Sequence, residues 1–461
     1  MAKYKAYPEY KDSGVEWLGE LPAHWKTLAI KHVARLNPSK SCISIEKMKG
    51  MCSFIPMEKL KFNSLCLDEI KGVSDVYNGY TYFENEDILI AKVTPCFENK
   101  NMVVAHELNN GIGFGSSEIY VLRCNDIINN YFLFYRLQED NFISIAEGTM
   151  TGAGGLKRVP SEILNNFKFG LPSKKEQSII VNFLKHETAK IDNLIEKQQQ
   201  LIELLKEKRQ AVISHAVTKG LNPYVPMKDS GVEWLGEVPE HWKIKRCKNL
   251  FDFVTSGSRG WAGFYSDEGD LFFRIANLTR DSINPKLDSI QYVTPPKGSE
   301  GERSKIKEND LLISITADLG SVCAAGKSIS GGYVSQHVSL CRPGRLVASS
   351  RWLAYFVLSD TAKEQLQGAG YGGTKVQLSL EDIRDLFVAY PPKSEQIKIA
   401  SYLDERLSEL DGLDHRAHNL IELLRERRTA LISAAVTGKI DVRGWVAPDT
   451  QNIEEPQEAT A

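Results

Sequence analysis

The chain has 461 residues, of which 42% are hydrophobic and 25% are charged, and its formal net charge is −2. This composition predicts a globular protein large enough for two or more hydrophobic cores. No apolar run reaches the roughly 18 to 20 residues that span a bilayer, and the first residues lack the apolar core of a signal peptide, so we expect a cytoplasmic protein. The small net charge argues against a protein that coats nucleic acid without selectivity, but it allows local basic patches.

Two blocks of sequence occur twice along the chain. The opening block KDSGVEWLGELPAHWK at 11–26 returns as KDSGVEWLGEVPEHWK at 228–243. A longer closing block that starts at Glu176 returns from Glu395 with a constant offset of 219 positions. The chain is therefore a tandem duplication.

Between the shared blocks lie two variable segments, residues 27–171 and 244–390, whose sequences have diverged. Each contains an apolar run of strand length, EDILIAKVT at 86–94 and NDLLISIT at 309–316. A half-buried strand and then a buried, aromatic-rich helix are predicted to follow in each copy: SSEIYVLR (116–123) and VSQHVSLCR (334–342), then NNYFLFYRL (129–137) and SSRWLAYFVL (349–358). The segments thus share a fold although their letters differ, which indicates two similar modules that recognise different things.

Near its end, each variable segment has a glycine-rich stretch with a basic residue, TGAGGLKR at 151–158 and GAGYGGTK at 368–375. Glycine allows a backbone to approach a phosphate or a base edge, and Lys or Arg supplies positive charge. A tight turn between two strands would give the same letters. Both interpretations remain open at this point.

Each closing block has the periodicity of a long helix that packs along another helix. Apolar residues recur at alternating steps of three and four, as in a coiled coil. At about 44 residues, each helix would be about 65 Å long. The predicted seam comprises Leu184, Ile191, Leu194, Leu201 and Leu205 in the first copy, and Leu403, Leu410, Leu413, Leu420 and Leu424 in the second.

The ends and the polar positions of these helices also carry predictions. Ser173 and Glu176 predict a capping box at the start of the first helix, and Gly220 predicts its end. Polar residues interrupt the seam at matching steps, Glu187 with Arg406 and Lys208 with Arg427. If the helices run antiparallel, acid and base could face each other there. Simple scaffold helices are the alternative interpretation.

Several other patterns do not predict a catalytic or metal site. The eight cysteines contain no CxxC pair, so we expect buried thiols instead of a zinc site or disulfides. Gly326, Lys327 and Ser328 look like the end of a phosphate-binding loop, but the preceding glycine is one residue too far away. The tail after Trp445 is polar and acidic, and we expect it to be disordered.

The layout, the GVEWLGELPAHW opening, the P-x-x-x-E-Q entry to each long helix at Pro172 and Pro391, and the ELL[KR]E[KR]R exit together resemble the specificity subunit of type I restriction-modification enzymes. The resemblance extends from about Lys11 to Trp445. It implies an α+β fold in which two α/β target-recognition domains are separated by a pair of long antiparallel coiled-coil helices with a pseudo-two-fold internal repeat. The expected divisions are a first recognition domain (1–171), a first spacer helix (172–218), a linker (219–226), a second recognition domain (227–390), a second spacer helix (391–437) and a partly disordered tail (438–461).

The resemblance also implies function. Each domain would read one half of a split double-stranded DNA sequence. Two methyltransferase subunits would dock on the helices with S-adenosylmethionine, and ATP- and Mg-dependent endonuclease subunits would join them, so this chain would have no catalytic site and no cofactor of its own. Two alternatives are a single-chain restriction and methylation enzyme, for which we find no cofactor motif, and a structural coiled-coil adaptor, which would not need two divergent modules.

Candidate base-contacting residues follow from the side chains that favour base edges in the major groove. They lie in the glycine-rich stretches and in the loop TSGSRGWAG, although Trp261 in that loop could simply be packed. The candidates are Lys157 and Arg158 in the first module and Arg259, Trp261, Tyr371, Thr374 and Lys375 in the second. The tryptophans of the opening blocks belong to the shared frame, so we expect them to anchor module to helix.

Overall fold

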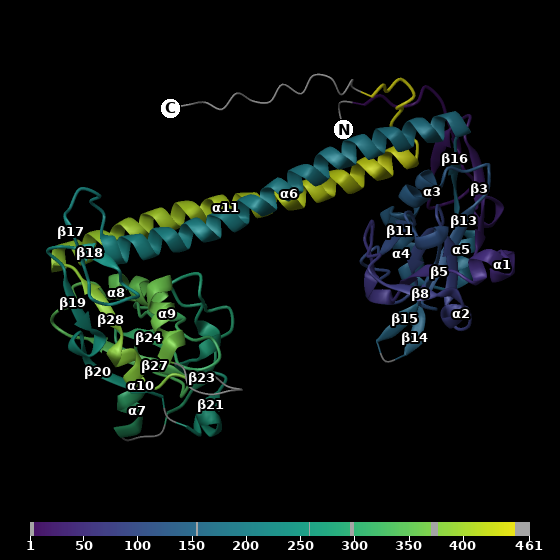
Figure 1. Cartoon of the computed structure of the whole chain (residues 1–461). Helices are drawn as coiled ribbons and strands as arrows, with labels where there is room; N and C mark the ends of the chain where they lie inside the picture. Colours follow the sequence, from purple (N-terminus) through teal and green to yellow (C-terminus); the bar gives the residue numbers. More distant parts are fainter. Residues whose placement is uncertain (1–3, 154, 258, 296–298, 370–376, 448–461) are drawn as a thin grey trace. The chain divides into compact units, whose positions relative to one another are not determined.

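The computed structural model describes residues 4–153, 155–257, 259–295, 299–369 and 377–447, coloured along the sequence in Figure 1. The chain divides into two compact units, the first made of residues 1–197 and 420–461 and the second of residues 198–419. Each unit therefore contains one half of α6 (Lys174–Lys219) and one half of α11 (Lys393–Val436). Within the described residues, no helix has the length and apolar character of a membrane span.

The first unit is built on two four-stranded sheets. One has the order β11-β10-β13-β4, and the other has the order β8-β5-β12-β9 with a parallel pairing of β5 and β12. Their strands are β4 (Ala34–Leu36), β10 (Ile88–Ala91), β11 (Met102–Val104) and β13 (Ile119–Cys124), and β5 (Met51–Ile55), β8 (Ile70–Gly72), β9 (Thr81–Glu84) and β12 (Ile112–Gly115). Two-stranded pairs are β1 (Tyr10–Asp12) with β2 (Glu20–Pro22), β3 (Lys26–Ala29) with β16 (Lys168–Leu171), β6 (Leu60–Lys61) with β7 (Ser64–Leu65), and β14 (Thr151–Ala153) with β15 (Leu156–Arg158). The short helices are α1 (Ile45–Met48), α2 (Val73–Val76), α3 (Asn130–Leu137), α4 (Asp140–Gly148) and α5 (Ser161–Asn166).

The second unit repeats this plan. Its sheet β20-β27-β24-β25 matches β4-β13-β10-β11, and its pairs β17-β18 and β19-β28 match β1-β2 and β3-β16. The strands are β17 (Met227–Asp229), β18 (Glu237–Pro239), β19 (Lys243–Arg246), β20 (Phe251–Ser256), β21 (Tyr265–Ser266), β22 (Asp270–Phe273), β23 (Tyr292–Val293), β24 (Leu311–Ser314), β25 (Val322–Ala324), β26 (Tyr333–Val334), β27 (Val338–Pro343) and β28 (Phe387–Tyr390). The helices are α7 (Ser299–Ser304), α8 (Ser350–Leu358), α9 (Asp360–Ala369) and α10 (Leu380–Asp385).

Strand β13, one of the two inner strands of the first sheet, is buried on both faces. Tyr120 and Leu122 of β13 belong to the core that includes α3, whereas Ile119 and Val121 belong to a separate core on the other face. The sequence predicted a half-buried strand here, and that expectation is wrong. The alternating pattern suggested that positions such as Tyr120 face solvent, but Tyr120 is buried in a core. The pattern alone does not reveal that a core lies on each side of the strand.

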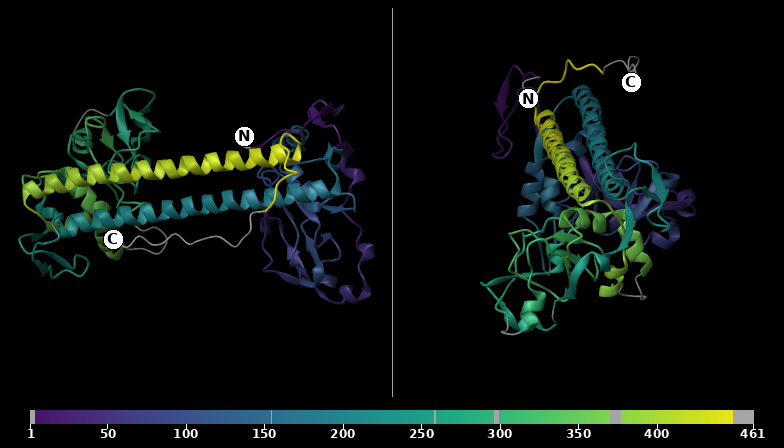
Figure 2. Two further views of the ribbon diagram at one scale, coloured as in Figure 1. Left: turned by 90° about the horizontal axis from the view of Figure 1, so that it is seen from above. Right: turned by 90° about the vertical axis from the view of Figure 1, so that its left-hand side faces the viewer.

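The two long helices run antiparallel in each unit, where their halves lie side by side (Figures 1 and 2). Six of the predicted seam residues are buried: Leu184, Ile191, Leu205, Leu403, Leu410 and Leu424. The other four are exposed, namely Leu194, Leu201, Leu413 and Leu420. Other buried positions of the two helices lie outside the predicted seam, at Thr188, Ile202, Leu407, Ile421 and Arg428.

The difference between the predicted and the observed seam has a simple cause. Leu194, Leu201 and Leu420 are each followed directly by isoleucine, so either of two adjacent apolar residues could face the other helix. The periodicity alone cannot choose between steps of three and four in that case.

Polar contacts between the helices also differ from the predicted pairs. In the first unit Arg428 Nε donates to Asp192 Oδ1 at 2.9 Å, and in the second unit Arg209 pairs with Asp411. The 219-residue offset relates Asp192 to Asp411 and Arg209 to Arg428, so the two ion pairs are copies of one contact. The periodicity predicts polar contacts at Glu187, Arg406, Lys208 and Arg427 instead.

The opening blocks join the ends of the helices to the modules. In the first unit the buried carboxylate of Glu176 accepts hydrogen bonds from Trp25 Nε1 at 3.1 Å and from the Tyr7 hydroxyl at 2.7 Å. In the second unit Glu395 accepts from Trp242 Nε1 at 2.9 Å. The predicted capping box is therefore only half formed, because Glu176 binds the opening block while its backbone N–H still donates to Ser173 Oγ.

The same two tryptophans also contact the end of the other long helix. A Cβ built on Gly220, just after α6, would lie 3.2 Å from the Trp242 ring, and one built on Gly438, just after α11, would lie 3.4 Å from the Trp25 ring. Both glycines have φ near +75°, which favours glycine at a helix end. Trp25 and Trp242 are thus the anchors expected from the sequence, whereas Trp234 is exposed.

Candidate nucleic-acid interface

The first glycine-rich stretch forms a β-hairpin, β14–β15, that is attached to the loop after β10. Lys157 N–H donates to Thr94 Oγ1 at 3.0 Å, and the Thr94 hydroxyl donates to the Gly155 carbonyl at 2.9 Å. A Cβ built on Gly152 would lie 2.1 Å from the Leu156 carbonyl oxygen, so this position requires glycine. The hairpin exposes both predicted candidates, Lys157 and Arg158.

Arg158 forms a bidentate ion pair with a residue that the sequence did not single out. Its Nε and Nη2 donate to the two carboxylate oxygens of Glu118 at 2.9 and 2.8 Å. Lys92 Nζ lies 3.9 Å from the same carboxylate. The hydrogen bonds from Arg158 lower the pKa of Glu118, and they raise the pKa of Arg158. The guanidinium is therefore held in one orientation by an ionised carboxylate.

The second module has the same backbone junction. Lys92 N–H donates to the Glu118 carbonyl at 3.0 Å in the first module, and Ile315 N–H donates to the His337 carbonyl at 3.1 Å in the second. Beside it, an isolated bridge joins Val93 to Arg158 in the first module and Thr316 to Gln377 in the second. We call this feature the junction: residues 92, 93, 118 and 158 in the first module and 315, 316, 337 and 377 in the second.

The side chains at the junction differ between the modules. The first module has Lys92, Glu118 and Arg158, which are all charged. The second has Ile315, His337 and Gln377 at the corresponding places, and His337 Nδ1 lies 3.0 Å from Thr316 Oγ1. One backbone arrangement thus presents an ion pair between Arg158 and Glu118 in one module and an amide and an imidazole group in the other.

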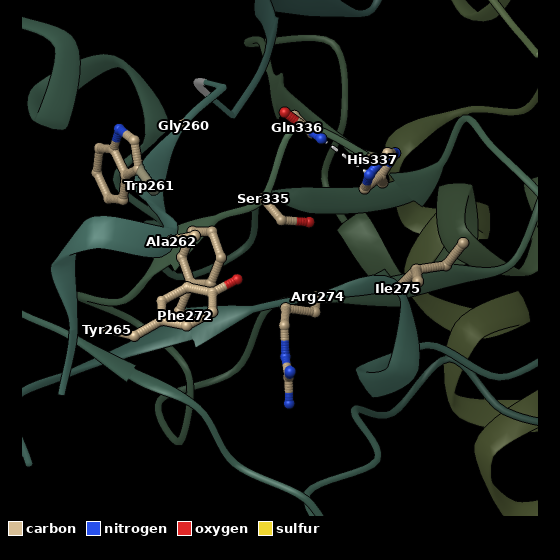
Figure 3. Close-up of a pocket in the computed structure, with 10 residues that line it drawn as sticks. All are labelled: Gly260, Trp261, Ala262, Tyr265, Phe272, Arg274, Ile275, Ser335, Gln336 and His337. Carbon is tan, nitrogen blue, oxygen red and sulfur yellow. Dashed lines mark hydrogen bonds between the residues drawn. The ribbon is translucent and has the colours of Figure 1, made fainter. Parts of the chain in front are cut away.

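A cavity of about 230 Å³ adjoins the junction of the second module. Figure 3 shows the rings of Trp261, Tyr265 and Phe272 on one side of it and the hydrogen-bonded Gln336 and His337 on the other. Trp261 stacks on Phe272 with ring centroids 5.8 Å apart. Among the described residues, the buried Trp261 Nε1 and Ser335 Oγ have no hydrogen-bond partner. The cavity therefore combines aromatic walls with unsatisfied polar groups.

The remaining candidates lie in different surroundings. Trp261 is only 3% exposed, so it is a wall of the cavity and its contact with DNA stays a prediction. Arg259 is exposed on the preceding turn. Tyr371, Thr374 and Lys375 lie outside the described residues.

Sequence reasoning missed Glu118, Gln336 and His337. A signal for them was present, because the 219-residue offset that aligns the helices also aligns SSEIYVLR with SQHVSLCR and places Glu118 opposite His337. The pairing of Glu118 with Arg158 could not be read from the sequence, since 40 residues separate them.

A second repeated ion pair supports the sheet beneath each junction. Arg123 Nε and Nη2 donate to the two oxygens of buried Asp87 at 2.8 and 2.7 Å. Arg342 makes the same two bonds to buried Asp310, both at 2.8 Å. Each aspartate also accepts from the backbone N–H three residues before it. The frame of the two modules is therefore the same down to individual hydrogen bonds.

Comparison with known proteins defines the class of this fold. The family model for the type I restriction modification DNA specificity domain matches the chain twice, at residues 22–204 and 239–423. The chain therefore belongs to this family and contains two copies of its domain.

Individual relatives agree with this assignment. The type I restriction enzyme EcoEI specificity subunit of Escherichia coli is 32% identical, over 90% of this chain and 83% of its own length. The EcoAI specificity subunit of the same species is 26% identical, over 94% of this chain and 86% of its own length.

Two solved structures share the fold. A chain from a study of complex assembly and conformational transition of the type I R-M system aligns with a TM-score of 0.72 and 15% identity, covering 90% of this chain and 98% of that one. The HsdS subunit from Thermoanaerobacter tengcongensis aligns with a TM-score of 0.55 and 17% identity, covering 91% and 98%.

Proposed function

We propose that this chain is the DNA-recognition subunit of a type I restriction-modification complex, in which each module reads one half of a bipartite DNA target. The observation that carries the proposal is the junction, where a common backbone presents different polar side chains in the two modules. Two readers of unlike half-sites need this combination, because backbone contacts position a protein on DNA and side chains specify the bases.

The long helices act as a spacer between the two readers. Their antiparallel pairing within each unit, with the duplicated Asp–Arg contacts, supports a stiff arrangement. A flexible connection would lower the effective concentration of the second reader at its half-site. The length of the helix pair would then set the number of unread base pairs between the half-sites.

Two methyltransferase subunits bind to the exposed face of these helices. Six leucines on this face are 38% to 61% exposed, and they form three pairs related by the 219-residue offset: Leu194 with Leu413, Leu201 with Leu420, and Leu204 with Leu423. Each unit contains three of them. Two equivalent sets of exposed leucines are compatible with two copies of one partner.

The chemistry belongs to the partner subunits. The methyltransferase subunits bring S-adenosylmethionine and modify adenine, and the endonuclease subunits bring ATP and Mg. The curated relatives, which are named as specificity subunits, support a non-catalytic role for this chain. The purified chain alone is expected neither to methylate nor to cleave DNA, and either activity in the isolated chain would contradict this part of the proposal.

The function is tested by expressing the chain with its methyltransferase subunit and mapping modified adenines across a bacterial genome. We expect a split motif with a constant gap. Unmodified DNA, in cells where the same methyltransferase is active with another specificity subunit, would refute the function.

An exchange of residues 27–171 for the module of a relative tests the division of labour. It should alter one half of the motif and leave the other half unchanged. A change in both halves would show that the modules do not read independently.

A further inference from the structure

We propose that the junction residues determine one base pair in each half-site: Arg158, oriented by Glu118, selects guanine in the first, and Gln377 beside His337 selects adenine in the second. This inference rests on the proposed function, because it assumes that the modules read DNA. It goes further by naming the residues and the bases.

The geometry of Arg158 leaves one edge of its guanidinium available. Nε and one hydrogen of Nη2 are used by Glu118, and Nη1 makes no hydrogen bond to the described residues. Nη1 and the second hydrogen of Nη2 form a pair of parallel donors. Guanine offers two acceptors, O6 and N7, on its major-groove edge, which such a pair fits.

The Glu118 contact makes this selection sharper. A free arginine can rotate to reach a phosphate, which carries no sequence information. With its Nε edge bound to a carboxylate, Arg158 loses this freedom before DNA arrives, and less rotamer entropy is lost on binding. Glu118 is therefore a positioning residue.

The second module places an amide and an imidazole at the same points of the backbone. Gln377 is exposed and corresponds to Arg158 through the shared bridge. A glutamine amide donates to N7 and accepts from N6 of adenine, a pattern that guanine cannot match. His337, which is held by Thr316 and Gln336, replaces the carboxylate.

The cavity beside His337 favours the same base pair. Thymine, the partner of adenine, carries a methyl group in the major groove that binds to apolar side chains. The walls formed by Trp261, Tyr265 and Phe272 provide an apolar site next to the polar groups of Gln336 and His337. An A·T pair thus matches both the amide of Gln377, which binds adenine, and the apolar walls of the cavity, which receive the thymine methyl group.

The test uses the complex of this chain with its methyltransferase subunit, and it combines motif mapping with binding to duplexes that vary one base at a time. Arg158→Ala is expected to reduce discrimination for guanine at one position of the first half-site by about tenfold or more, while the second half-site stays unchanged. The pattern of the loss distinguishes a base contact from a phosphate contact. Loss of a phosphate contact would weaken binding to all duplexes alike, whereas loss of the guanine contact changes the preference at one position only.

Arg443→Ala is a matched control. Arg443 makes the same bidentate contact with Asp441, and its side chain is 43% exposed compared with 45% for Arg158. It follows α11, whereas Figure 1 shows β14 and β15 at the other end of this unit. The control should leave the motif unchanged.

A transfer experiment tests the second half. The double variant His337→Glu, Gln377→Arg should replace the preference for adenine by one for guanine at one position of the second half-site. The inference is refuted if the wild-type first half-site requires no guanine, if Arg158→Ala retains full selectivity or weakens binding to all duplexes alike, or if a folded double variant keeps the wild-type second half-site. A wild-type complex that gives no split motif would instead refute the proposed function, so the two failures are distinguishable.

Discussion

The two modules of this chain share a frame but not a surface. Both have a buried aspartate bound in bidentate fashion by an arginine of the strand β13 or β27, and both have the same backbone hydrogen bond at the junction. At the surface, the Arg158–Glu118 ion pair of the first module corresponds to the amide of Gln377 and the imidazole of His337 in the second. A duplicated protein can therefore change what it reads by replacing a few exposed side chains, since the hydrogen bonds that position them do not depend on their chemistry.

Disturbing the part that both modules share should have the largest effect. A seven-residue insertion in α6 alone would shift the pairing of Asp192 with Arg428 or of Arg209 with Asp411, and we expect modification to be lost. Matched seven-residue insertions in α6 and α11 should retain the pairing and widen the gap in the motif by about three base pairs, from about 1.5 Å per residue and about 3.4 Å per base pair. Motif mapping checks both results, and an unchanged gap with the matched insertions would contradict the spacer role.

Removing the arginine that binds each buried aspartate tests whether these contacts are equally important in the two modules. Arg123→Ala and Arg342→Ala each leave a buried carboxylate without its partner, and each should lower the free energy of unfolding by about 3–5 kcal/mol. Urea denaturation of the variants measures this loss. The exposed pair in the Arg443→Ala variant should cost less than about 1 kcal/mol. If Arg123→Ala lost as little stability as this control, the Asp87–Arg123 pair would not support the fold of the first module.

The anchors of the two opening blocks should differ in strength. Glu176 is buried and accepts hydrogen bonds from Trp25 and Tyr7. Glu395 is one-third exposed, so in its absence a water molecule can accept the hydrogen bond from Trp242. Glu176→Ala should therefore cost about 3 kcal/mol and Glu395→Ala about 1 kcal/mol. Thermal unfolding of both variants compares them, and equal losses would show that burial does not distinguish the anchors.

The smallest effect concerns cysteine reactivity, which should also separate the modules. Cys66 in the first module is exposed, whereas Cys247, Cys323 and Cys341, which are all the cysteines of the second module, are buried. Burial raises the pKa of Cys323 and of Cys341 to about 12, so both remain protonated thiols at pH 8. Brief alkylation of the native chain at pH 8 should label peptides of the first module alone, as read by mass spectrometry. Fast labelling of Cys323 would contradict the packing of β25.

The repeat, the long helices and the strands around residues 88–91 and 311–314 could all be predicted from sequence, because each depends on local or periodic signals. The predicted helix seam was partly wrong because Leu194 and Leu201 are each followed by an isoleucine, and the sequence alone does not tell which of two adjacent apolar residues faces the other helix. The candidate site was predicted only in part. Arg158 was found through its neighbouring glycines, but its partner Glu118 depends on the pairing of distant strands, which local patterns do not encode.

The contact between the segment after α11 and the N-terminal segment has a consequence for biosynthesis. Asp441 N–H donates to the Lys5 carbonyl at 2.7 Å, and Ile432, Val436 and Ile440 belong to the core of the first unit. A ribosome that has made only the first half of the chain has therefore not yet supplied part of that core. The second unit is one continuous stretch and can be completed earlier, so the half that is synthesised first should be the half that matures last.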